Sequence, residues 1–233
     1  MTDSAVPALP PPPNTADQGP DPAAPPGTLW ARMKADPQYA PEHLALEAVR
    51  RLGPEAQRWA DRVRLEQPAL TPDALAQQVI RRFTNHARLS GAVSGATGLP
   101  GAVVDVGVLA WTQARMVLHV AAAYGIDPTG PERATDLLVL QRVHKAAEAA
   151  RLALGVAAGR ERASRLFATS AGQPLSGVMF KLGVKLAQMA GVRAAQRMFA
   201  KVVPGAAMVL GTWANSAATK ELARRTTELY RHS

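Results

Sequence analysis

The long apolar stretch formed by residues 101–124 contains three ionisable side chains that could take part in chemistry, Asp105, Arg115 and His119. Asp105 and His119 are fourteen positions apart. On one straight α-helix this separation corresponds to about 21 Å, because each residue adds about 1.5 Å along the axis. Two side chains at that distance cannot act as a catalytic pair. We predict instead that each is satisfied by a neighbouring helix.

A second pair of candidate ligands, His144 and Glu148, lies one helical turn apart and would bind a metal only with ligands from elsewhere. The sequence contains no H-E-x-x-H motif, no phosphate-binding G-x-x-x-x-G-K-[ST] loop and no correctly spaced G-x-S-x-G elbow. It also contains no cysteine, which excludes disulfides, thiolate metal ligands and cysteine nucleophiles. We therefore predict no catalytic residue, no cofactor and no metal site, and we interpret His144 and Glu148 as a solvated pair.

Positive charge is concentrated at the end of the chain. The whole sequence has 27 Lys and Arg against 18 Asp and Glu, a formal charge of +9. Residues 151–233 alone hold 13 basic residues against 3 glutamates, which gives 13 − 3 = +10. Five of these cations recur among apolar residues at helical spacing: Lys181, Lys185, Arg193, Arg197 and Lys201. The pattern fits a basic amphipathic helix lying on an anionic membrane, and it also fits an ordinary surface helix that covers a core.

The elements that must position these residues are predicted to be helices. Residues 1–28 hold nine of the nineteen prolines and almost no large apolar side chain, so burial cannot offset the entropy they would lose on ordering. We predict a disordered proline-rich tail over residues 1–28. One all-α domain should follow over residues 29–233, since this length and hydrophobic content suit a single core.

Prolines and glycines mark the helix boundaries predicted for this domain. A helix over residues 41–52 should be closed by Gly53, and a second helix over residues 54–68 should begin at a proline. A further helix is predicted from residue 131 to about residue 158.

The tripeptide Thr71-Pro72-Asp73 predicts another helix start, with a cap, a proline and an acidic first turn. The helix that follows has three apolar residues at core spacing, Leu75, Val79 and Phe83. Arginines on the helices before residue 90 are expected on solvated faces: Arg50, Arg51, Arg58, Arg62, Arg64, Arg81, Arg82 and Arg88.

The helix over residues 101–124 is long enough to cross a membrane, yet glycines and charges interrupt its apolar run. We therefore expect a buried core helix, or one that enters the membrane interface, in preference to a span. A Pro-Gly pair precedes this helix, and a similar Pro-Gly pair opens the apolar stretch 202–215. The two stretches predict two Pro-Gly helical hairpins that either pack together or dip into a bilayer.

Several short motifs in a fixed order make the chain resemble the EcsC family of bacterial proteins over roughly residues 40–230. The residues that carry the resemblance are Gly95, Gly98, Leu99, Pro100, Gly101, Asp105, Gln113, Tyr124, Gly125, Ile126, Asp127, Val203, Pro204, Gly205, Gly211 and Asn215. The resemblance implies an all-helical fold without an established reaction, and it supplies no catalytic residues. The family is named after a member encoded beside ABC transporter genes, which associates it with membrane work.

Taken together, these features predict a non-enzymatic, membrane-associated or accessory helical protein. Its expected partner is an anionic phospholipid surface or a membrane protein, bound through the basic C-terminal third. The amino terminus has neither a basic start nor an apolar core, so we expect a cytoplasmic protein, peripheral on the inner face of the cell membrane. The alternatives are a nucleic-acid-binding protein that uses the same basic face, and an enzyme that uses Asp105, His119 or His144.

Overall fold

The computed structural model describes residues 24–90, 98–166, 182, 185–186, 189 and 206–233. Regular structure in these residues is entirely helical and confirms the predicted all-α class. The elements are α1 (Gly27–Ala35), the 3-10 helix η2 (Pro37–Tyr39), α2 (Ala40–Glu66), α3 (Pro72–Ser90), α4 (Gly98–Ala123), α5 (Glu132–Leu140), α6 (Ala147–Leu166) and α9 (Ala206–Arg231). Most of the predicted proline-rich tail, residues 1–23, lies outside the described residues.

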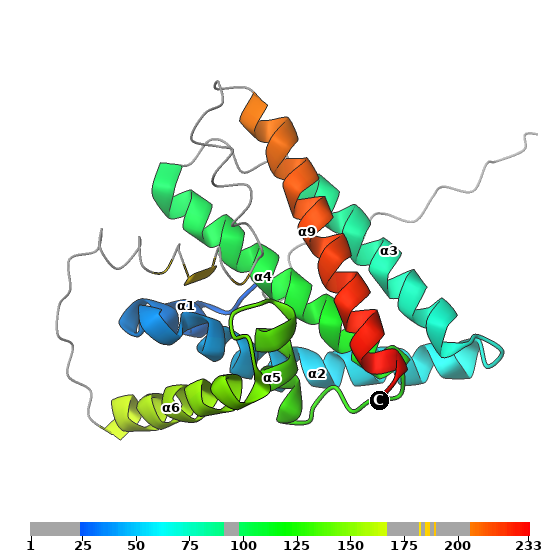
Figure 1. Cartoon of the computed structure of the whole chain (residues 1–233), viewed down its shortest axis with the longest axis horizontal. Helices are drawn as coiled ribbons and strands as arrows, with labels where there is room; N and C mark the ends of the chain where they lie inside the picture. Colours follow the sequence, from blue (N-terminus) through cyan, green and yellow to red (C-terminus); the bar gives the residue numbers. More distant parts are fainter. Residues whose placement is uncertain (1–23, 91–97, 167–181, 183–184, 187–188, 190–205) are drawn as a thin grey trace, which may run out of the picture.

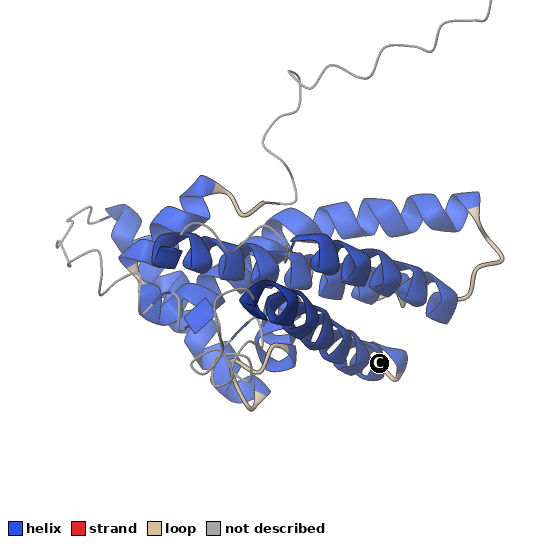
Figure 2. Ribbon diagram, turned by 90° about the horizontal axis from the view of Figure 1, so that it is seen from above, coloured by secondary structure: helices blue, strands red, loops and turns tan. Residues whose placement is uncertain are grey.

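Helix α4 lies at the centre of the fold. It packs against α2, α3 and α9, and α5 also touches it (Figure 1). Seen from above, the long helices cross one another in a layered bundle (Figure 2). The buried side chains of α4 form much of the core: Leu109, Ala110, Trp111, Ala114, Met116, Val117, Leu118, Val120 and Ala121.

The central position of α4 makes it a core helix of the fold, although its composition also suits a membrane-spanning helix. Among the described residues, only Val106–Ala123 is long and apolar enough to cross a membrane, and 78% of it is buried inside the fold. Such burial is typical of a core helix, because other helices occupy the faces that lipid would need.

The start of α4 differs from the prediction. The helix begins at Gly98, so Pro100 and Gly101 lie in its first turn and do not form a turn ahead of it. A proline is tolerated there because the first backbone N–H groups of a helix have no intrahelical acceptor. The second Pro-Gly pair, Pro204 and Gly205, lies outside the described residues, as does Gly95.

The two helices predicted over residues 41–52 and 54–68 are one continuous helix, α2, so that prediction was wrong. Pro54 lies inside α2. An interior proline removes one backbone hydrogen bond and costs about 3 kcal/mol. Apolar burial along both halves of the helix outweighs this cost, through Leu44, Ala48, Leu52, Ala56 and Ala60.

The single helix predicted over residues 131–158 is also wrong, because a turn separates α5 from α6. Arg142 has a φ of +58° in this turn. Its N–H donates to the Val139 carbonyl at 2.9 Å, and the Val143 N–H donates to the Leu138 carbonyl at 2.9 Å. This is the hydrogen-bond pattern of a Schellman motif, in which the left-handed residue is usually glycine. Because an arginine occupies this position, the sequence contains no glycine that would predict the end of the helix.

The carboxyl end of α4 uses the same motif with the expected residue. Gly125 has a φ of +81°. Its N–H donates to the Ala122 carbonyl at 3.0 Å, and the Ile126 N–H donates to the Ala121 carbonyl at 3.0 Å. Two successive helices of this fold therefore end in the same motif, one with glycine and one with arginine in the left-handed position.

Exchanging these residue types should change stability in opposite directions. Gly125→Ala is expected to lower the free energy of unfolding by about 1 kcal/mol, because a Cβ is disfavoured at positive φ. Arg142→Gly is expected to raise it by up to about 1 kcal/mol for the same reason. Urea unfolding followed by far-ultraviolet circular dichroism measures both changes. Shifts of the same sign would contradict this account.

Helix α3 is confirmed where it was predicted. The Ala74 N–H donates to the Thr71 hydroxyl at 3.3 Å, so Thr71 acts as the expected cap. Leu75 and Val79 are buried, and Phe83 packs against the core.

The basic segment predicted to be amphipathic is described at four positions only. Leu182, Lys185, Leu186 and Met189 are helical, and the three apolar members are buried in the core. Positions four and three residues apart share one stripe of a helix, so these three side chains point the same way. Lys185 is partly exposed, while Lys181, Arg193, Arg197 and Lys201 lie outside the described residues.

Candidate functional site

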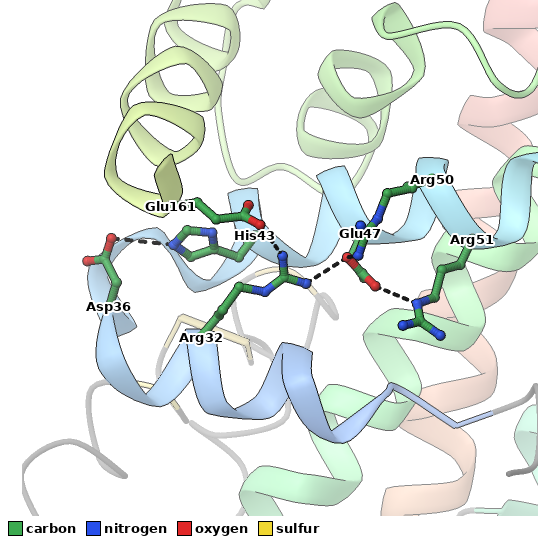
Figure 3. Close-up of polar contacts among 7 residues, drawn as sticks. All are labelled: Arg32, Asp36, His43, Glu47, Arg50, Arg51 and Glu161. Carbon is green, nitrogen blue, oxygen red and sulfur yellow. Dashed lines mark hydrogen bonds and ion pairs between the residues drawn. The ribbon is translucent and has the colours of Figure 1, made fainter. Parts of the chain in front are cut away.

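A buried carboxylate lies at the centre of a polar cluster between α1, α2 and α6 (Figure 3). The side chain of Glu47 is only 1% exposed. It accepts a hydrogen bond from Arg32 of α1 at 2.6 Å and another from Arg51 at 2.5 Å. A third comes from Arg50. A buried carboxylate is strongly disfavoured unless it is paired, and here three guanidinium groups pair with it.

The same cluster connects helix α6 to α1 and to the residues that follow α1. Arg32 also donates to the Glu161 carboxylate of α6 at 2.5 Å. Arg160 forms an ion pair with Asp36 at 3.4 Å, and its guanidinium lies 5.3 Å from the centre of the Tyr39 ring. Thus two neighbouring residues of α6 hold the start of the described fold: Glu161 contacts α1, and Arg160 contacts the segment that joins α1 to α2.

The electrostatics of Glu47 follow from this geometry. Burial alone would raise the pKa of the Glu47 carboxyl, but the hydrogen bonds from Arg32, Arg51 and Arg50 outweigh burial and hold the pKa below its ordinary value. For Arg32, burial disfavours the charged form, yet the contacts with Glu47 and Glu161 raise its pKa above the ordinary value. Both groups therefore remain charged at neutral pH.

A cavity of about 180 Å³ opens beside the cluster. Its lining residues are Arg32, Ala35, Asp36, His43, Arg160 and Glu161. The Nε2 atom of His43 lies 3.4 Å from the Asp36 carboxylate, which gives a histidine–carboxylate pair. Among the described residues that line the cavity, none carries a hydroxyl or thiol that such a pair could activate as a nucleophile. Its cations and carboxylates are paired with one another, so the cluster is suited to holding three helices together.

Sequence analysis missed this cluster. It placed Arg50 and Arg51 on a solvated face, and both side chains are indeed exposed, but it did not show that their guanidinium groups also pair with the buried Glu47 carboxylate. One feature of the sequence indicated a buried carboxylate: Glu47 lies on the same face of α2 as the apolar residues Leu44 and Ala48. Its cluster partners Arg32 and Glu161 are too far away in the sequence for helical periodicity to indicate them.

His119 is the most perturbed histidine among the described residues. Its ring lies between Trp59 and Phe83, with centroid distances of 5.3 and 5.6 Å. The Nδ1 atom hydrogen-bonds to the carbonyl of Arg115 at 2.8 Å, one turn earlier in the same helix. The hydrogen bond therefore stays within α4, while the neighbouring helix α2 places the Glu55 carboxylate 3.9 Å from the Nε2 atom, so the prediction of a partner on a neighbouring helix is confirmed only for this second contact. Burial lowers the pKa of His119 to about 4, so the ring is neutral at physiological pH.

His144 does not form the predicted solvated pair with Glu148. Its Nε2 atom lies 2.7 Å from a carboxylate oxygen of Glu42, which is buried on α2. The turn between α5 and α6 moves His144 off the helix that carries Glu148, which explains the difference. Within the described part of the chain, no three His, Cys, Asp or Glu side chains gather closely enough to hold a metal ion.

Comparison with known proteins identifies the family to which the chain belongs. A model described as the EcsC protein family matches residues 60–232. The chain belongs to the EcsC protein family. No match to a curated protein or to a solved structure was found. The EcsC match begins at residue 60, later than the predicted residue 40, so Arg32, Asp36, His43 and Glu47 precede the EcsC region.

The EcsC motif after α4 has clear structural roles. The Tyr124 hydroxyl donates to the Asp73 carboxylate at 2.6 Å, and Arg231 donates to the same carboxylate at 2.9 Å. These contacts join the end of α4 to the start of α3 and the end of α9. Asp127 accepts hydrogen bonds from the backbone N–H and hydroxyl of Thr129, which stabilise the following turn.

The remaining EcsC motif residues are only partly described. Gln113 of α4 donates to the Thr219 hydroxyl of α9 at 3.4 Å, which places this motif residue at a helix contact. Asp105 and Asn215 lie in α4 and α9, but their side chains are outside the described part. Three polar side chains that carry the resemblance to EcsC proteins, Gln113, Tyr124 and Asp127, therefore bind a neighbouring helix or turn.

Proposed function

We propose that this EcsC family protein is a non-enzymatic, peripheral membrane protein that binds an anionic phospholipid surface through its basic C-terminal third. The observation that carries the proposal is the uneven distribution of charge. Residues 29–150 hold 14 Lys and Arg against 12 Asp and Glu, or 14 − 12 = +2. Residues 151–233 reach 13 − 3 = +10. The excess positive charge therefore belongs to one part of the chain.

Side-chain contacts are consistent with this distribution. In the described part of residues 151–233, four cations have no carboxylate partner within 4 Å: Arg151, Arg162, Lys185 and Lys220. Cations near a membrane surface each contribute about 1 kcal/mol to binding anionic lipid. Because α4 is largely buried in the fold, we propose contact at the surface and no span.

Vesicle flotation tests the proposal. The full-length protein should float with vesicles that contain phosphatidylserine and should not float with vesicles of phosphatidylcholine alone. Binding should fall as salt is raised, because screening shortens the range of surface charges to about 8 Å at 0.15 M. A protein that stays in the soluble fraction with both vesicles at low salt would overturn the proposal. Salt-sensitive binding to a nucleic acid duplex without lipid binding would favour the nucleic-acid alternative.

Charge reversal identifies the part of the chain responsible. Replacing five cations by glutamate should weaken binding to anionic vesicles by more than about 1000-fold, at about 1 kcal/mol for each lost contact. These five are Lys181, Lys185, Arg193, Arg197 and Lys201. The matched control reverses five exposed cations outside the C-terminal third: Lys34, Arg58, Arg62, Arg81 and Arg82. Equal losses in both variants would show that only net charge matters.

A further inference from the structure

The outer face of helix α6 combines exposed apolar side chains with unpaired arginines. Leu152 is 74% exposed and Val156 is 44% exposed, although the opposite face buries Ala150, Leu154 and Ala157. Leu152 and Val156 are one turn apart, so they form a short apolar stripe. They leave a small apolar patch exposed on this surface helix.

Positive charge borders this stripe. Arg151 and Arg162 are exposed, and neither has a carboxylate within ion-pair distance among the described residues. They are eleven positions apart, which places them about 20° from each other around a helix of about 100° per residue. Both lie roughly 80–100° from Leu152 by the same geometry. The arginines therefore form one edge of the apolar stripe.

Helix α6 is held firmly with this face outward. Arg32 binds Glu161 on the inner side of the helix, and Arg160 binds Asp36 although its own side chain is 55% exposed. Helices α5 and α2 pack against α6, which lies at the periphery of the fold (Figure 1). The outer face is thus presented as a rigid surface.

We propose that the outer face of α6 is one of the elements that contact the anionic bilayer, an inference that rests on the proposed function. Leu152 and Val156 enter the boundary between headgroups and acyl chains, while Arg151 and Arg162 bind lipid phosphates. This combination of an apolar stripe and flanking cations is what interfacial helices use. A second copy of the chain suits the face less well, because it would bring unneutralised arginines of like charge together.

A single fluorescent label tests this contact directly, because the chain has no cysteine of its own. Leu152→Cys labelled with nitrobenzoxadiazole should show a blue shift and a rise in emission of about twofold or more on phosphatidylserine vesicles. Leu65→Cys is the control, since Leu65 is 84% exposed at the far end of α2. Its label should not respond. A shift that appears at high protein concentration without vesicles would indicate self-association and overturn the proposal.

Flotation of charge and apolar variants separates this inference from the proposed function. The double variants Leu152→Glu/Val156→Glu and Arg151→Glu/Arg162→Glu should each bind phosphatidylserine vesicles at least about tenfold more weakly. The control Arg58→Glu/Arg62→Glu should bind like the unaltered protein. If the unaltered protein and both α6 variants float equally, the α6 contact is wrong and the proposed function stands. If the unaltered protein does not float, both are wrong.

Discussion

Replacing Glu47 with glutamine should lower the free energy of unfolding by about 3 kcal/mol, because it removes the negative partner of a buried ion pair. The substitution keeps the size of the side chain and leaves Arg32 with one carboxylate in place of two. Arg50 and Arg51 can turn into solvent, so the main loss arises at Arg32. Urea unfolding at pH 7 measures the change.

The matched control for Glu47 is Glu228→Gln. Glu228 also pairs with an arginine, Arg224, but both side chains are exposed. Exposed pairs contribute little, so this variant should unfold like the unaltered protein. A Glu47→Gln protein that is as stable as the control would show that the cluster does not hold α1 and α6 in place.

Acidification offers a second readout of Glu47. Its folded pKa lies below the ordinary value of 4.5, so its stabilising contribution is present above pH 4.5 and is lost as the pH falls through the folded pKa. The glutamine variant lacks this contribution. Its stability should therefore fall less steeply than that of the unaltered protein in this acidic range.

Replacing His119 with leucine should remove much of the dependence of stability on pH between 6.5 and about 4. The folded pKa is about 4, and the ordinary value is 6.5. Between these values the unfolded chain binds a proton that the folded protein rejects, so stability falls as the pH falls. The difference of about 2.5 pH units corresponds to as much as about 3 kcal/mol.

Unfolding free energies measured from pH 8 to pH 4 test this sign. Above pH 7.5 both proteins have an uncharged residue at position 119, so their difference in stability should be constant. Below pH 6.5 the difference should shift in favour of the leucine variant. A difference that stays constant down to pH 4 would show that water reaches the ring between Trp59 and Phe83.

The predictions for Glu47 and His119 depend on contacts with residues that are distant in the sequence, so the local sequence does not indicate them. Glu47 obtains its partner Arg32 from 15 positions earlier, and Glu161 joins the cluster from 129 positions beyond Arg32. No helical periodicity reports such distant pairs, because periodicity describes one face of one element. His119 was recognised as a polar point in an apolar helix, but its aromatic neighbours come from α2 and α3.

The amino-acid sequence by itself determined the all-α class, the Thr71 cap, the glycine end of α4 and membership of the EcsC family. Each depends on local residue types or on short motifs in order, which act through nearby backbone geometry. The predicted tail, the second Pro-Gly turn and the basic segment stay predictions, whereas the first Pro-Gly pair lies inside α4.

Only the tertiary structure decided that α2 continues through Pro54, that the chain turns at Arg142, and that the most apolar helix forms the core. At Pro54, apolar burial against other helices outweighed a local preference, and at Arg142 local hydrogen bonds hold an unfavourable backbone conformation. The same long-range packing presents Leu152 and Val156 to solvent beside unpaired arginines. Sequence analysis predicted the working surface in the basic C-terminal third, with five candidate cations between residues 181 and 201, and we propose that the outer face of α6 belongs to it.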